Sequence, residues 1–214
     1  MSKRERKIVV EAVIPAPVEL VWHRSQDPVQ HVQWDIRFTR IDYLSRKDER
    51  GYHLMDYRTD VAFGLEVKGI GRYLHSTPLR HSTFEFESDD WKSIIQEGRG
   101  IWLYEERPGG TYFKTVYDYQ RRYGALGQVL DWILLRRLLQ LATEWSFETL
   151  RLWCAGDEHA CARRRSRLRF LAFFAGRVIG FPRTEGAARS WLGSGREVQF
   201  ADQLSAAEEV SRTR

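Results

Sequence analysis

The sequence predicts an α+β fold in which a seven-stranded antiparallel sheet is combined with one long, apolar C-terminal helix. Two observations carry this prediction. Residues 126–153 repeat apolar side chains at steps of three and four, which is typical of an amphipathic helix. Residues 36–122 instead form short alternating stretches separated by polar or glycine-containing turns, which is typical of consecutive antiparallel strands.

The long helix is expected to begin after Gly124 and to stop near Gly156. At 1.5 Å per residue, the stretch from Leu126 to Trp153 would be about 42 Å long. A helix this apolar needs a large partner surface, and the preceding strands offer one. We therefore expect its apolar stripe to face the concave side of the sheet; the stripe includes Leu130, Ile133, Leu134, Leu138 and Leu141.

One strand and two short helices precede the other six strands. Residues 7–14 are rich in Ile and Val and predict the first strand. Pro17 suits the first turn of a short helix over residues 18–22, and Asp27 with Pro28 suits the cap and first turn of a second one. The other strands are predicted over residues 36–44, 52–59, 65–75, 80–87, 92–107 and 111–122.

This order of elements resembles the helix-grip fold of the START-like superfamily, also called the polyketide cyclase/dehydrase and lipid-transport (SRPBCC) superfamily. Three stretches carry the resemblance. Residues 14–22, IPAPVELVW, look like the family's entry into its first helix. Trp34-Asp35 sits where the family often has a Trp opening the second strand, and Gly109-Gly110-Thr111 resembles its last hairpin. The resemblance covers residues 7–153 and indicates no subfamily.

The resemblance implies a curved sheet that wraps its concave side around the long helix, with an apolar cavity between them. It also implies a small hydrophobic ligand, such as a lipid, sterol, quinone, polyketide or aromatic compound. Ligand cavities usually enclose about 300–1,000 Å³. A one-residue slip in strand register would exchange the two faces of the sheet. For each aromatic residue, the alternative to lining a cavity is packing in a solid core against the helix. The expected lining is Met55, Tyr57, Phe84, Phe86, Trp102, Phe113, Tyr117, Tyr119, Leu130, Leu134 and Leu138.

No catalytic residue is predicted, because the family has no universal catalytic residues and no His pairs with a carboxylate at a persuasive spacing. The polar candidates in the predicted strands are His53, Asp56, His75, His81, Glu85, Glu97 and Asp118. Alternation places most of them on the solvent face. His53 is the exception, because it shares a face with Met55. We therefore expect binding or transport of a hydrophobic molecule. The alternative is a cyclase/dehydrase-type enzyme acting on an aromatic or polyketide-like substrate.

No cofactor or metal is expected. Cys154, His159 and Cys161 are too few and too widely spaced for a structural zinc site. The sequence also lacks a phosphate-binding loop, a nucleophile elbow and a dinucleotide fingerprint.

The C-terminal part has a different composition from the rest. We predict a ligand-binding domain over residues 1–155, a basic and apolar helical extension over 156–183, and a polar, poorly ordered tail over 184–214. The net charge of +5 comes largely from the extension, where seven Arg accompany two carboxylates. A helix from Ala162 to Phe181 has three candidate partners: the domain itself or a dimer partner, an anionic membrane, and, least favoured, a nucleic acid. The oligomeric state is not indicated.

A cytoplasmic location is expected, with membrane association as an alternative. The mean hydropathy of −0.50 and the lack of an apolar run near 18 residues argue against a membrane span. The basic N-terminus is not followed by an apolar signal-peptide core. Two Cys make no disulfide framework, which agrees with a reducing compartment.

Overall fold

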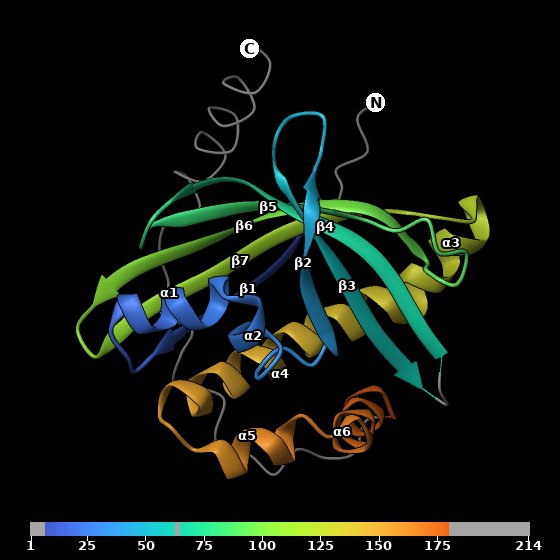
Figure 1. Ribbon diagram of the computed structural model, residues 1–214. Helices are drawn as coiled ribbons and strands as arrows, with labels where there is room; N and C mark the ends of the chain where they lie inside the picture. The colour runs from blue at the N-terminus through green and yellow to red at the C-terminus, as the bar shows by residue number, and fades with distance from the viewer. Residues whose placement is uncertain (1–6, 63–64, 180–214) are drawn as a thin grey trace. The chain divides into compact units, whose positions relative to one another are not determined.

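The computed structural model describes residues 7–62 and 65–179. Seven strands form one antiparallel sheet, in the order β1-β7-β6-β5-β4-β3-β2, that lies over the long helix (Figure 1). The predicted meander is thus confirmed, with β1 added beside β7. The strands are β1 (Ile8–Ile14), β2 (Arg40–Lys47), β3 (His53–Ala62), β4 (Leu65–Thr77), β5 (His81–Glu87), β6 (Ile95–Arg107) and β7 (Gly110–Arg121). The division into 1–155, 156–183 and 184–214 stays a prediction, and Phe181 and the tail lie outside the described residues.

Glycines on the inner face of the sheet are covered by aromatic rings from the next strand. A Cβ atom at Gly71 would overlap the ring of Tyr57, and one at Gly98 would overlap the ring of Phe86. Gly100 is covered in the same way by Phe84. These glycines therefore let the rings lie against the backbone, as aromatic residues do when they cover strand glycines.

The two edges of the sheet are β1 and β2. Beside β1, the side-chain Nε2 of Gln140 donates a hydrogen bond to the Val9 carbonyl at 3.1 Å. Along β2 lie Arg40, Asp42, Arg46 and Lys47, and the pairing of β2 with β3 shifts register after Tyr43.

Two short helices, α1 (Val18–Gln26) and α2 (Pro28–His31), follow β1 as predicted, and the Asp27 side chain caps α2 by accepting from Val29 N at 2.8 Å. The second strand, however, begins at Arg40 and not at Ile36. Asp35 Oδ1 accepts a hydrogen bond from Arg37 N at 3.0 Å, and Ile36 N donates to Ser146 Oγ at 3.1 Å. These local side-chain hydrogen bonds replace strand pairing at residues 35–37.

The long helix is continuous in chain but has three parts: α3 (Gly124–Leu130), a π-helical turn η1 (Asp131–Leu135), and α4 (Arg136–Cys154). Gly156, with φ of 77°, follows the end of α4, as expected for a glycine that stops a helix. In Figure 1, α3 forms the free end of this helix at the right of the view.

The prediction of which helix residues face the sheet was wrong. Leu135, Leu139, Phe147 and Leu150 pack into the main core. Leu138 and Leu141 pack in a second cluster with Phe170 and Phe174. The exposed fractions of Leu130, Ile133 and Leu134 are 38%, 61% and 46%. The helix carries two apolar stripes, and the π turn changes the residue phase between its two ends. A single period fitted across residues 126–153 therefore selected the wrong stripe.

The second stripe of α4 packs against the C-terminal extension. The extension forms two helices, α5 (Glu158–Arg164) and α6 (Arg167–Ile179), where one was expected. Phe170 and Phe174 of α6 are buried with Leu141, Ala142 and Ile36. This packing agrees with the docked-helix alternative for the extension. Among the described helices, none combines the length and apolarity that crossing a membrane requires.

Candidate functional site

The predicted lining residues of the sheet all lie on one face. Met55 pairs with Gly71, which pairs with Phe86, and this row continues through Gly98 to Tyr119. A neighbouring row joins Phe84 to Gly100 and Tyr117. The structure thus brings together the eight strand residues chosen from the sequence, while their role in binding stays a prediction.

This inner face is closed in one part and partly open in another. Met55, Trp102, Phe113, Tyr117 and Tyr119 are buried. The other three strand residues, Tyr57, Phe84 and Phe86, keep part of their surface accessible.

The three helix residues of the predicted lining do not join these rings in the main core. Leu138 is partly buried in the second cluster with α6, and Leu130 and Leu134 are exposed. On the helix, Leu135 and Leu139 take the places that the sequence assigned to Leu130, Leu134 and Leu138.

The closed part of the interior is an aromatic cluster around His31. The His31 ring stacks on Trp34 with a centroid distance of 4.8 Å and meets the edges of Phe38 and Trp102 at 5.5 and 5.2 Å. The ring centroid of Phe113 lies 5.9 Å from that of Trp102. Aromatic packing of this kind fixes the orientation of the imidazole.

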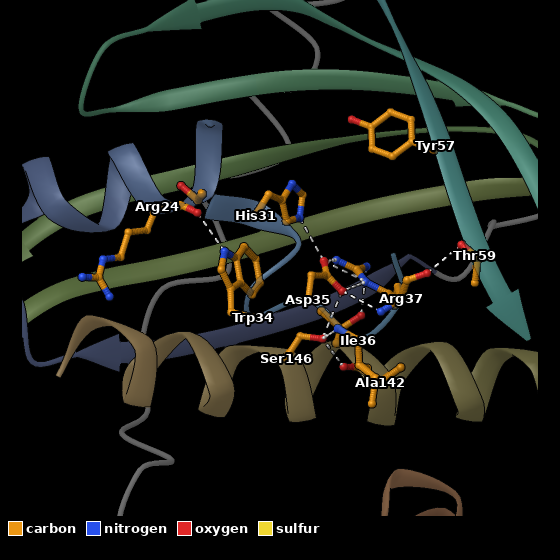
Figure 2. Close-up of polar contacts among 12 residues, drawn as sticks. Arg24, His31, Trp34, Asp35, Ile36, Arg37, Tyr57, Thr59, Ala142 and Ser146 are labelled. Carbon is orange, nitrogen blue, oxygen red and sulfur yellow. Dashed lines mark hydrogen bonds and ion pairs between the residues drawn. The ribbon is translucent and has the colours of Figure 1, made fainter. Parts of the chain in front are cut away.

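One ring nitrogen of His31 points at a buried carboxylate. His31 Nε2 lies 3.1 Å from Asp35 Oδ2 (Figure 2). The same carboxylate accepts hydrogen bonds from Arg37 Nη2 at 2.6 Å and Nε at 2.9 Å, and from Ser146 Oγ at 3.1 Å. Asp35 is 1% exposed and His31 is 3% exposed, so this network joins α2, the following turn and α4 inside the protein.

Arg37 extends the network toward the sheet. Its Nη1 donates to Thr143 Oγ1 at 3.2 Å, and Thr143 in turn bonds the Tyr117 hydroxyl at 2.9 Å. Burial alone would raise the pKa of Asp35, but the positive charge and hydrogen bonds of Arg37, with the bond to His31, hold that pKa well below its usual range. Asp35 is therefore ionised and Arg37 is charged at neutral pH.

The sequence-based expectation that no His pairs with a carboxylate was wrong. His31 and Asp35 are four residues apart at the end of α2, a spacing that places two side chains on the same side of a helix. That spacing was the available signal. It was missed because Asp35 was assigned to the start of a strand and because candidates were sought on strands.

Three of the polar strand residues considered as catalytic candidates are accessible to solvent. His53, the exception expected on the inner face, is exposed. Asp56 pairs with Arg58 at 2.9 Å, and Glu85 pairs with Arg72 at 3.1 Å along the outer face. These outer ion pairs are partly solvated and contribute little to a reactive site.

Two cavities lie away from the long helix. One of about 390 Å³ lies at the β6–β7 hairpin, next to the start of α1. The other, of about 330 Å³, crosses β4 to β7 and is lined mainly by charged residues, with Phe86 and Tyr119 at its border. No described residue of α3 or α4 lines either of them. An interior cavity between the sheet and the long helix therefore stays a prediction.

Comparison with known proteins gives one relative in sequence and several in structure. An uncharacterized membrane protein, YndG, of Bacillus subtilis (strain 168) is 37% identical over 161 residues, which cover 73% of this chain and 60% of that protein. The chain thus spans 60% of the length of this relative. No protein-family model matches the sequence.

Solved structures share the architecture at low sequence identity. TTHA0849 from Thermus thermophilus superposes with a TM-score of 0.57 at 18% identity, covering 71% of this chain and 99% of that one. Ara h 8.0201 gives 0.50 at 9% identity, with coverages of 71% and 98%. NE0264 from Nitrosomonas europaea gives 0.51 at 10% identity, with coverages of 74% and 99%. At these identities the likeness shows the fold: residues 8–154 of this chain form a helix-grip fold.

Proposed function

We propose that the protein binds a hydrophobic small molecule, a lipid, quinone, polyketide or aromatic compound, against the concave face of its sheet. The observation that carries the proposal is the partial burial of Phe84 and Phe86. Their rings cover Gly100 and Gly98 on the inner face, and both residues are only partly buried. An apolar ligand laid on these rings would remove their accessible surface from water, which favours binding.

Two tyrosines on the same face offer polar contacts for such a ligand. Burial raises the pKa of Tyr57 and that of Tyr73, so both hydroxyls stay protonated at neutral pH. A protonated phenol can donate a hydrogen bond to a carbonyl or hydroxyl of a ligand. Apolar walls with a few placed hydroxyls are the usual composition of small-molecule sites.

Binding of an apolar fluorescent probe tests this proposal. We expect Phe86→Gln to weaken the probe's affinity by about tenfold, because a polar group replaces an apolar contact worth about 1.4 kcal/mol. The matched control is Glu87→Gln, the next residue on the same strand, whose exposed side chain lies on the opposite face. Measured affinities that fall equally in both variants, or in neither, would contradict the proposal.

The second candidate is an enzyme of the cyclase/dehydrase type, and the pairing of His31 with Asp35 favours it. A histidine oriented by a carboxylate is a usual general base. Native mass spectrometry distinguishes the two functions. The full chain is incubated with a compound that it binds, and the molecule recovered from the protein is then identified. A carrier returns the compound unchanged, whereas an enzyme returns a product, whose formation His31→Gln would abolish while the compound still binds.

We also propose that the protein acts at a membrane surface. The Bacillus subtilis relative is named a membrane protein, and this supports a role at a membrane surface. The sequence suggested the segment from Ala162 to Phe181 as the contact. Within its described part, α6 turns Phe170 and Phe174 inward and leaves Leu168 and Leu171 exposed.

A further inference from the structure

A second apolar surface lies at the free end of the long helix, on α3 and η1. Over nine residues it presents six large apolar side chains to solvent: Leu126, Val129, Leu130, Trp132, Ile133 and Leu134, with exposed fractions of 63%, 50%, 38%, 78%, 61% and 46%. We call this set the α3 tip. We propose that the α3 tip inserts into the interface of an anionic membrane and that it, and not α6, anchors the protein there.

The α3 tip is inverted relative to an ordinary surface helix. Between residues 124 and 134 the buried residues are Gly127 and Asp131. Gly127 lies so close to the Arg122 carbonyl that a Cβ atom would overlap it. Asp131 accepts hydrogen bonds from the Tyr119 hydroxyl and, at 2.9 Å, from Arg121 Nη1. Up to Leu134, the contacts that hold this segment to the sheet are thus polar or backbone contacts, and its large apolar side chains are exposed; Leu135, at the end of η1, is the first to pack into the main core.

This inversion indicates a partner that is itself apolar. Surface helices of soluble proteins turn their apolar stripe toward the core. A contiguous exposed apolar surface of this kind marks an interaction site. Helix α6 shows the ordinary arrangement, because its Phe170 and Phe174 are buried against α4.

Charge around the α3 tip selects the kind of partner. Arg121 and Arg137 are exposed beside it, and Arg136 is partly exposed. The carboxylate within the tip, Asp131, pairs with Arg121, so the net positive charge beside the tip comes from Arg136 and Arg137. An apolar surface with a cationic rim complements an anionic lipid headgroup layer over an acyl region. A symmetric dimer through the same surface would instead bring two cationic rims together.

A neighbouring turn adds a second exposed tryptophan at the same place. Trp91, between β5 and β6, is 74% exposed, and Tyr123, directly before α3, is 45% exposed. The Tyr123 hydroxyl donates a hydrogen bond to the Trp91 carbonyl, so this turn is joined to the base of the tip. Trp and Tyr are the residues enriched at membrane interfaces.

Co-sedimentation of the full chain with vesicles tests the inference. The probes are vesicles of equal parts phosphatidylglycerol and phosphatidylcholine, and vesicles of phosphatidylcholine alone. We expect the wild type to bind the anionic vesicles more tightly, and the double variant Trp132→Glu/Ile133→Glu to lose about tenfold or more of that binding. The matched control is Leu168→Glu on α6, which is 80% exposed and should bind as the wild type does.

Quenching by brominated acyl chains gives a readout that folding defects would not imitate. Trp132 is one of eight tryptophans. We expect Trp132→Phe to keep vesicle binding but to lose a large part of the quenching seen in the wild type. Circular dichroism and size-exclusion chromatography of each variant show whether it is folded and monomeric.

Several outcomes would overturn the inference. These are vesicle binding that survives Trp132→Glu/Ile133→Glu, binding that Leu168→Glu abolishes instead, and a concentration-dependent dimer of the wild type that the double variant dissociates. The inference rests on the proposed function in one respect: membrane binding would give the protein access to a ligand dissolved in the membrane. Because the vesicle assay uses no such ligand, its failure is distinguishable from failure of the probe-binding assay.

Discussion

Replacing Asp35 by Asn is expected to lower the free energy of unfolding by about 3–5 kcal/mol, the usual loss when one partner of a buried ion pair is removed. The carboxylate is 1% exposed and accepts hydrogen bonds from Arg37 and Ser146. Asparagine keeps the shape of the side chain but leaves Arg37 without its counter-charge. Urea denaturation of the two proteins at pH 7 measures the difference.

Two comparisons separate this effect from the loss of any single hydrogen bond. Asp35→Asn combined with Arg37→Met removes both charges and should destabilise less than Asp35→Asn alone. Glu148→Gln, which breaks the partly exposed pair with Arg151 at 2.6 Å, should cost about 1 kcal/mol or less. A change below about 0.5 kcal/mol for Asp35→Asn would refute the structural role of the network.

The stabilisation by the Asp35 carboxylate should also depend on pH. The pKa of Asp35 is lower in the folded protein than its unfolded value of about 3.9. The unfolded state therefore binds more protons in acid, so the stabilisation is fully present above about pH 4 and is lost as the pH falls further. We expect the acid limb of the stability profile to be shallower in Asp35→Asn.

Leu150→Ala is expected to cost about 2–5 kcal/mol, whereas Leu134→Ala should stay within about 0.5 kcal/mol of the wild type. Leu150 is 0% exposed in the main core and Leu134 is 46% exposed. The two leucines lie on one helix and lose the same atoms, so they form a matched pair. Thermal or urea unfolding of both variants measures the contrast, and equal costs would contradict the different burial of the two leucines.

The sheet could be predicted from the sequence because its signals are local. Alternation with a period of two assigns each strand residue to a face, and Phe84, Phe86, Phe113, Tyr117 and Tyr119 all lie on the face expected. The short turns between strands left an antiparallel meander as the simple topology. Strand ends were less accurate where side chains intervene, as at Asp35.

The helix face and the buried network depend on information that is not local. Leu134 and Leu135 are adjacent and equally apolar, and the π turn between α3 and α4 leaves no mark in the apolar pattern. The Ser146 partner of Asp35 is 111 positions away in sequence. The spacing of His31 and Asp35 was readable, but its meaning required knowing that α2 ends against the aromatic interior.

The sheet edges have a consequence for how folded copies can associate. An open edge is a template onto which another strand can add, and addition leads to domain swapping or fibrils. On β1, the Gln140 amide already occupies the Val9 carbonyl. On β2, the row of charged residues and the register shift after Tyr43 disfavour a flat incoming strand. Copies of this protein should therefore resist edge-to-edge polymerisation even at high concentration, and contacts between them should form through side-chain surfaces.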